Sequence, residues 1–289
     1  MANGILIIDK PADWTSHDVV AKLRGILHEK RIGHAGTLDP MATGVLPVFV
    51  GRATRAVEFA ADREKEYIAG LRLGIITDTQ DVTGSTLETR PVETDRSGLE
   101  QILDRFRGEL LQIPPMYSAV KKNGKKLYEL ARRGEEVERE PRPITVYALE
   151  LVEQVSATDY ILRVLCSKGT YVRTLCHDIG QALGCGGTLY SLRRTRSAGF
   201  GLEQAMTLEA VREAPDPAAL LLPVDAYFSD YPALTLPNEA QERKVRNGNP
   251  IQADGLDGVY RVYGPAGDFL ALSRLTRGRL STIKSYFEV

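Results

Sequence analysis

Strand and helix patterns follow one another irregularly along this chain, and this limits the folds it can adopt. Residues 65–73 alternate apolar and polar side chains, as in a half-buried strand. Residues 144–155 and 160–166 predict two more strands, and residues 171–183 then predict a helix. A parallel doubly wound sheet would need steady β-α-β alternation. The pattern instead predicts an α+β fold with a mixed, mainly antiparallel central sheet flanked by helices and loops.

Local signals predict where two helices begin. Ser16 is the expected N-cap of a helix that runs to about residue 28. Ser97 and Glu100 have the spacing of a capping box before a second helix. Between the first helix and the next strand, residues 31–44 are rich in Gly, Thr and Pro and are expected to form a loop.

The chain is expected to divide near Asp230 into a large domain (1–230) and a small one (231–289). The segment before Asp230 is acidic and contains several prolines. After it, Asn238 is expected to cap a short basic helix, and two strand-like segments follow. About 60 residues are enough for a small β-rich domain that leans on its neighbour.

Basic residues cluster although the formal net charge of the chain is only −1. Residues 121–142 hold eight Lys or Arg against five Glu, and they include Lys125 and Lys126. This segment has one short apolar helix face, so it is expected to project as a basic arm. Local positive charge suits a track for a polyanion, although ordinary solvated surfaces explain such a cluster equally well.

Several classes of site are not supported by any motif. The sequence has no phosphate-binding glycine motif, no G-x-S-x-G elbow, and no His or Cys spacing typical of zinc. The three cysteines are expected to be small buried side chains. Residues 77–84 resemble a calcium loop but lack its final Glu, so they are expected to form a turn stabilised by Asp and Thr side chains. Without an export signal or a long apolar run, we expect a cytoplasmic protein that uses no metal or cofactor.

The loop at residues 34–46 is the most unusual passage. Gly36 and Gly44 allow tight turns or close approach of the backbone. Asp39 precedes Pro40, which keeps the aspartate out of the α region and suits a carboxylate presented from a fixed loop. An Asx-turn or a helix cap explains most Asp-Pro pairs, so the residues alone leave the role of Asp39 open.

This loop resembles the signature of the TruB family, bacterial tRNA pseudouridine synthases that act on uridine 55 of the TΨC arm. Other segments of the chain resemble further motifs of the family, and they occur in the same order: Gly4–Ser16 with Lys10-Pro11, Lys65–Tyr67, Thr77–Gly84, Ile113–Ala119 and Cys166–Arg173. The resemblance spans most of residues 4–200. By position, the last 60 residues resemble the family's small RNA-binding PUA domain.

The resemblance implies roles for the matching residues. Asp39 matches the catalytic aspartate, Tyr67 the aromatic residue that stacks on the target base, and Arg173 the arginine that pairs with the aspartate. His34 matches a histidine that holds the displaced uridine, and Leu192 an apolar wall of the pocket. The expected substrate and RNA contacts also include Lys10, Tyr171, Lys125 and Lys126.

These residue types suit an isomerisation. Pseudouridine is an isomer of uridine, so its formation needs no redox carrier or energy donor. An ionised Asp39 could act as a nucleophile or stabilise charge, and attack at C1′, attack at C6 and elimination of a sugar proton all stay open. Arg173 is expected to keep Asp39 charged, and the Tyr67 hydroxyl could move a proton at C5 of a flipped-out base.

Three other hypotheses share some of these features. The first is a tRNA-binding protein that remodels its RNA, with modification secondary. The second is the guide-RNA-dependent relative of the family, which belongs to a larger complex. The third is a hydrolase that uses Asp39 with water and releases uracil. We expect tRNA, through its T arm, as the partner of a monomer that has no obligate protein partner and no membrane association.

Overall fold

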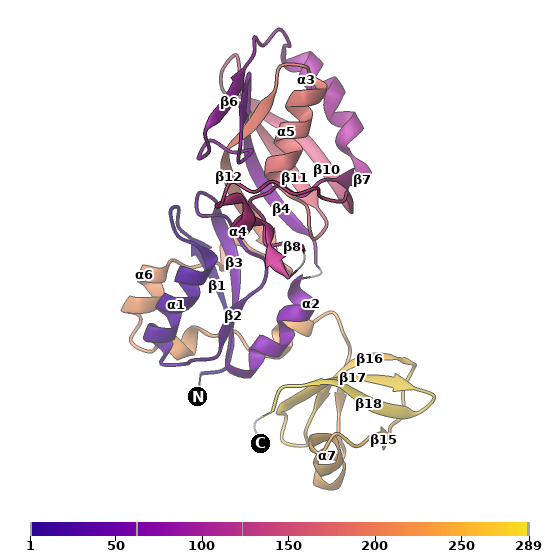
Figure 1. Ribbon diagram of the computed structural model, residues 1–289. Helices are drawn as coiled ribbons and strands as arrows, with labels where there is room; N and C mark the ends of the chain where they lie inside the picture. The colour runs from indigo at the N-terminus through magenta and orange to yellow at the C-terminus, as the bar shows by residue number, and fades with distance from the viewer. Residues whose placement is uncertain (1, 62, 123, 288–289) are drawn as a thin grey trace.

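The computed structural model describes residues 2–61, 63–122 and 124–287, and it contains two main sheets (Figure 1). The larger has nine strands, seven of them in the order β1-β3-β12-β4-β11-β10-β7, with β2 beside β3 and β13 beside β12. Strands β3 and β12 run parallel, and the other neighbours are antiparallel. The predicted α+β class with a mixed, mainly antiparallel sheet is confirmed.

The large sheet contains strands at the predicted segments 65–73, 144–155 and 160–166, with bounds that agree to within two residues. Its strands are β1 (Gly4–Lys10), β2 (Ile32–His34), β3 (Thr43–Val50), β4 (Lys65–Leu73), β7 (Gly108–Gln112), β10 (Arg142–Gln154), β11 (Asp159–Cys166), β12 (Gly187–Ser197) and β13 (Phe200–Gly201). Two hairpins stand apart from it, β5 (Ile75–Thr77) with β6 (Thr86–Thr89) and β8 (Lys121–Lys122) with β9 (Lys125–Lys126). The α-helices are α1 (Ser16–Leu27), α2 (Val57–Ala61), α3 (Arg96–Leu103), α4 (Leu127–Ala131), α5 (Val172–Ala182), α6 (Leu208–Glu213) and α7 (Glu239–Arg246). Short 3₁₀ turns are η1 (Gly51–Ala56), η2 (Asp104–Phe106), η3 (Leu202–Gln204), η4 (Pro217–Leu220) and η5 (Val224–Phe228).

Helices cover the large sheet at both of its ends. In Figure 1, α3 and α5 lie together beside the strands from β12 to β10, and α1 and α6 lie together beside β1. Leu175 and Ile179 of α5 pack with Leu71 and Leu162 of the sheet in one apolar cluster. The candidate site lies on the loop before β3, on the first turn of α5, and on β4 and β12.

The first two observed helix caps differ by one or two residues from the predicted ones. Thr15, not Ser16, caps α1 and forms a capping box with Asp18. The buried Ser16 hydroxyl instead accepts a hydrogen bond from Leu38 N at 2.9 Å. Asp95, not Ser97, caps α3 through the backbone N–H of Gly98. In both cases a neighbouring side chain with the same capping chemistry is better placed.

The predicted loop at residues 31–44 is only partly irregular. Residues Ile32–His34 form β2, which pairs with the end of β3, and β3 itself begins at Thr43. A three-residue strand is too short to show a period-two pattern, so the residue pattern did not predict β2.

A second sheet follows the large one in sequence. Its strands are β14 (Ala233–Thr235), β15 (Ile251–Gln252), β16 (Gly258–Tyr263), β17 (Phe269–Thr276) and β18 (Arg279–Ser285). Asn238 caps α7, as predicted. Leu236, Val262 and Leu270 belong to this part's own apolar cluster, while Leu272 and Tyr286 join a cluster with residues of β1 and β3. The boundary near Asp230 stays a prediction.

The predicted arm folds into a short hairpin and helix. Strands β8 and β9 are followed by α4, whose apolar face is buried at Leu127 and Leu130. The backbone of α4 is bonded to Val120 O and Ser118 O. Asn123 lies outside the described residues. Within residues 2–61, 63–122 and 124–287, no helix is long and apolar enough to cross a membrane.

Close packing of β3 against β12 makes Gly44 a sensitive position. Gly44 has a φ of +101°, and a Cβ built there would lie 2.2 Å from Arg194 O. We expect Gly44→Ala to destabilise the fold by about 2–4 kcal/mol, because strain and overpacking add. Thermal or urea unfolding measures this.

Gly25→Ala is the matched control. Gly25 lies in α1, and nothing surrounds its Cβ position within 4 Å. This substitution is expected to leave stability unchanged or raise it by about 0.5–1 kcal/mol. Equal unfolding midpoints for the two variants would contradict the proposed packing of Gly44.

Candidate active site

Side chains that bond to backbone groups hold the loop that carries Asp39. Ser16 Oγ is hydrogen-bonded to both the N–H and the carbonyl of Leu38, at 2.9 and 3.2 Å. The buried Lys10 Nζ donates to Pro40 O at 3.2 Å and to Pro11 O and Trp14 O. The residues on both sides of Asp39 are therefore fixed, and the carboxylate is presented from a rigid loop.

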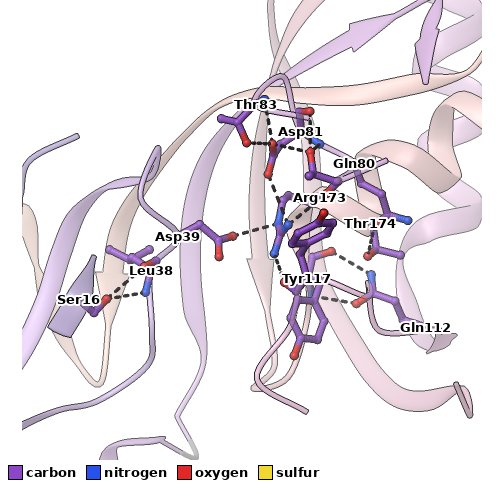
Figure 2. A network of polar contacts seen from close by, with 12 residues as sticks. Ser16, Leu38, Asp39, Gln80, Asp81, Thr83, Gln112, Tyr117, Arg173 and Thr174 are labelled. Carbon is purple, nitrogen blue, oxygen red and sulfur yellow. Dashed lines mark hydrogen bonds and ion pairs between the residues drawn. The ribbon is translucent and has the colours of Figure 1, made fainter. Parts of the chain in front are cut away.

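Asp39 meets Arg173 across the site (Figure 2). Arg173 Nε lies 3.0 Å from Asp39 Oδ2. The Arg173 side chain is only 5% exposed, whereas that of Asp39 is 39% exposed. The other guanidinium nitrogens donate to Thr79 O at 3.1 Å and to Tyr117 O at 2.8 Å. The predicted pairing of these two residues is thus present in the geometry.

Asp81 is a second carboxylate on Arg173. Its Oδ2 lies 3.4 Å from Arg173 Nη1, and its Oδ1 accepts hydrogen bonds from Thr79 Oγ1 and from Thr83 N and Oγ1. Residues 77–84 therefore form the predicted turn with Asp and Thr side chains bonded to its backbone. Sequence reasoning missed the contact of Asp81 with Arg173, although the run of Asp and Thr marked the turn.

Burial dominates the electrostatics of Asp39. Burial raises the pKa of Asp39 above its ordinary value, and the Arg173 charge lowers it by a smaller amount. The Asp81 charge also raises this pKa. Arg173 thus acts in the expected direction but does not outweigh burial. Burial likewise lowers the pKa of Lys10 to about 8, and the Asp39 charge opposes that shift.

Tyr67 and Leu192 line the same apolar cluster as Leu38 beside Asp39. Tyr67 lies on the buried face of β4, as its alternating pattern predicted. Burial raises the pKa of Tyr67, and the nearby charge of Arg194 lowers it. The phenol is therefore neutral and sits in an apolar setting close to the carboxylate.

Tyr171 is the N-cap residue of α5, two positions before Arg173. Its backbone N–H donates to Gln112 Oε1 at 2.8 Å, and Gln112 Nε2 donates to Tyr171 O at 3.1 Å. This pair fixes the start of α5 against β7. Arg173 consequently projects from the first turn of a helix whose entry is held in place.

Among the described residues, no hydrogen bond or ion pair joins His34, Lys125 or Lys126 to Asp39 or Arg173. His34 is half-buried, burial lowers its pKa, and its Nδ1 has no hydrogen-bond partner among the described residues. Lys126 Nζ donates to the Tyr128 hydroxyl at 3.2 Å, while Lys125 is exposed. The arm adjoins the site at its base, where Tyr117 O accepts from Arg173.

The structure adds Arg194 to the predicted residues. Arg194 is fully buried on β12, and it donates to Val45 O at 2.7 Å and to Gly36 O at 2.9 Å. No group of three or more potential metal ligands occurs among the described side chains. The three cysteines are buried and unpaired, as expected, and burial raises the pKa of Cys166 to about 11.

Comparison with known proteins places this site in a family. Residues 24–172 match the N-terminal domain of TruB family pseudouridylate synthases, and residues 173–229 match the C-terminal domain of tRNA pseudouridylate synthase B. These segments contain Asp39, Tyr67 and Arg173. The fold and the matched region define a pseudouridine synthase, which is an isomerase.

Individual relatives agree over nearly the whole chain. The tRNA pseudouridine synthase B of Alkaliphilus oremlandii is 46% identical over 92% of this chain and 87% of its own length. That of Escherichia coli O1:K1 / APEC is 43% identical over 94% of this chain and 91% of its own. A chain in a crystal structure of a Cbf5–Nop10–Gar1 complex has a TM-score of 0.74 at 27% identity, over 99% of this chain and 85% of that one. The chain belongs to the TruB family.

The raised pKa of Asp39 gives a stability test. The ionised form of Asp39 is disfavoured in the folded state. The contribution of Asp39 to the stability of the fold is therefore fully present below its pKa in the unfolded chain. It is lost as the pH rises through its pKa in the folded protein. We expect the melting temperature of Asp39→Asn, relative to the unsubstituted protein, to rise as the pH increases from about 3 to about 7. Calorimetry across this range measures the difference.

Asp159→Asn is the control of opposite sign. Arg72 hydrogen-bonds Asp159 at 2.8 Å through two nitrogens and lowers the pKa of that carboxylate. The contribution of Asp159 to the stability of the fold is therefore present above its pKa in the unfolded chain, and it is lost in acid. The relative melting temperature of Asp159→Asn should fall as the pH rises, and parallel trends for both variants would refute the assignment for Asp39.

Proposed function

We propose that this protein converts uridine 55 in the T loop of tRNA to pseudouridine. The observation that carries the proposal is the contact between Asp39 and the buried Arg173, 3.0 Å apart, inside the segment matched to the family. The substrate assignment rests on the motif resemblance and on relatives that are themselves tRNA pseudouridine synthase B.

Asp39 is the proposed catalytic carboxylate. The reaction breaks the N1–C1′ bond, turns the uracil and joins C5 to C1′. One carboxylate suffices, because the detached uracil stays in the pocket and no second carboxylate is needed to activate water. Burial disfavours the charged form of Asp39, and the positive charges of Arg173 and, to a smaller extent, Lys10 favour its ionisation.

Tyr67 and Leu192 are proposed to hold the flipped base. The target must leave its stack to reach a carboxylate inside a protein. Tyr67 offers an aromatic face and a hydroxyl that moves the C5 proton, and Leu192 packs in the same cluster. His34, whose Nδ1 has no hydrogen-bond partner in the part of the chain that the structure describes, is proposed to hold the displaced nucleotide out of the loop. Tyr171 is proposed to complete the substrate contacts. The buried Lys10, predicted as a further contact, donates to three backbone carbonyls and is proposed to support the Asp39 loop instead.

Residues 1–230 are proposed as the catalytic domain and residues 231–289 as a PUA-like RNA-binding domain. The arm at 121–142, with Lys125 and Lys126, would follow the phosphate backbone. We propose that the protein acts as a monomer without an obligate protein partner. The identity of 43–46% to tRNA pseudouridine synthase B, against 27% to a chain of a Cbf5–Nop10–Gar1 complex, supports action on tRNA over guide-RNA dependence.

Tritium release from [5-³H]uridine-labelled tRNA transcript tests the proposed reaction. The unsubstituted protein should release tritium, and Asp39→Asn should release none while binding tRNA with similar affinity. A transcript with cytidine at position 55 is the substrate control. Tight binding without release by the unsubstituted protein would favour the tRNA-remodelling hypothesis, and free uracil would favour a hydrolase.

The arm makes a separate prediction. Replacing both Lys125 and Lys126 by Ala should weaken tRNA binding and reduce the magnitude of the slope of log affinity against log salt by about 1–2. The reason is that each phosphate contact releases about one counterion on binding, and the variant makes fewer such contacts. Binding isotherms at several salt concentrations measure the slope. Lys22→Ala with Lys30→Ala removes two exposed lysines near α1 and serves as the charge-matched control. An unchanged slope for the arm variant would rule out this role.

A further inference from the structure

Arg194 is a buried cation without an anionic partner. Its side chain is fully buried, and no carboxylate of the described residues acts on it. Its Nη1 has no hydrogen-bond partner within the same described residues. Burying a guanidinium without a counter-charge is costly, so such a residue is retained where its charge or its donors are needed.

Two hydrogen bonds connect Arg194 to the loop that carries Asp39. Nη2 donates to Gly36 O at 2.9 Å, before Asp39, and Nε donates to Val45 O at 2.7 Å, after it. The backbone of Arg194 also lies against Gly44, its partner in the parallel pairing of β12 with β3. Arg194 therefore holds both ends of this loop.

The same side chain faces Tyr67. Arg194 and Tyr67 are direct partners in the antiparallel pairing of β12 with β4. The guanidinium is close enough to the Tyr67 phenol to favour its ionised form, and it also acts on His34 and Lys10. The buried charge of Arg194 thus acts on Tyr67, His34 and Lys10, which all have proposed roles.

We propose that Arg194 is a positioning residue. It fixes Tyr67 and the Asp39 loop relative to each other, and it places its positive charge beside the Tyr67 hydroxyl. This inference rests on the proposed function, because it assigns Arg194 a role in the step where Tyr67 moves a proton. A charge beside the phenol stabilises developing negative charge on its oxygen. Arg194 acts through Tyr67 and the loop.

Three variants separate charge from packing. Arg194→Met removes the charge and the donors, Arg194→Lys keeps the charge, and Arg72→Met removes an arginine of β4 that pairs with Asp159. Single-turnover tritium release with saturating protein, tRNA affinity and melting temperature are measured for each. We expect Arg194→Met to slow release roughly tenfold or more while affinity stays within about twofold. Arg194→Lys should fall between, and Arg72→Met should match the unsubstituted protein.

The titration of Tyr67 is a readout that needs no catalysis. NMR of protein labelled with carbon-13 tyrosine follows the phenol, with Tyr67→Phe assigning its signal. Besides Arg194, the titratable groups that act on it are Cys166 and Asp39, both of which raise its pKa. Losing the Arg194 charge should raise the pKa of Tyr67 in Arg194→Met and leave it nearly unchanged in Arg194→Lys.

The outcomes are distinct. Slower release with unchanged tRNA affinity and a higher pKa of Tyr67 in Arg194→Met supports the inference. An unchanged pKa of Tyr67 in Arg194→Met overturns the inference. Slower release together with a lower melting temperature would then show a purely structural role of Arg194. If Arg194→Met does not fold, a Tyr67 pKa in Arg194→Lys far from that of the unsubstituted protein overturns it. Absence of tritium release by the unsubstituted protein would reject the proposed function, while the titration would still test Arg194.

Discussion

The guanidinium of Arg173 is the contact on which the rest of the site depends. It is nearly inaccessible to solvent, and it contacts Asp39, Asp81, Thr79 O and Tyr117 O. The two carboxylates and two carbonyls around it offset the cost of burying this cation. One side chain from the first turn of α5 therefore fixes the positions of the Asp39 loop, the turn at 77–84 and the segment that leads to the arm.

The charge balance around this arginine explains the state of Asp39. Two carboxylates share one guanidinium, and burial opposes the charge on Asp39 more strongly than Arg173 favours it. Asp81 is fixed by Thr79 and Thr83 and is fully enclosed, whereas Asp39 stays partly open to solvent. The more exposed carboxylate is thus the one available to a substrate, and the enclosed one orients the arginine.

Local patterns in the sequence predicted β4, β10 and β11, because alternation reflects burial of one face, but they did not predict β2, β7 or β12. They failed at two helix caps, because Thr15 and Asp95, one and two residues before Ser16 and Ser97, offer the same chemistry. Asp39 and Arg173 were found through ordered motifs. Asp81 and Arg194 were not assigned roles, because their importance depends on pairings between segments more than ninety residues apart in sequence.

The loop around Asp39 is held from several sides by side chains that bond to backbone atoms. Lys10 bonds to Pro40 O, Ser16 to the backbone of Leu38, and Arg194 to Gly36 O and Val45 O. Arg173 then bonds to the Asp39 carboxylate itself. Anchors of this type fix the path of the main chain independently of the loop's own side chains. The carboxylate is therefore oriented before any substrate arrives, and binding does not have to supply the free energy of ordering it.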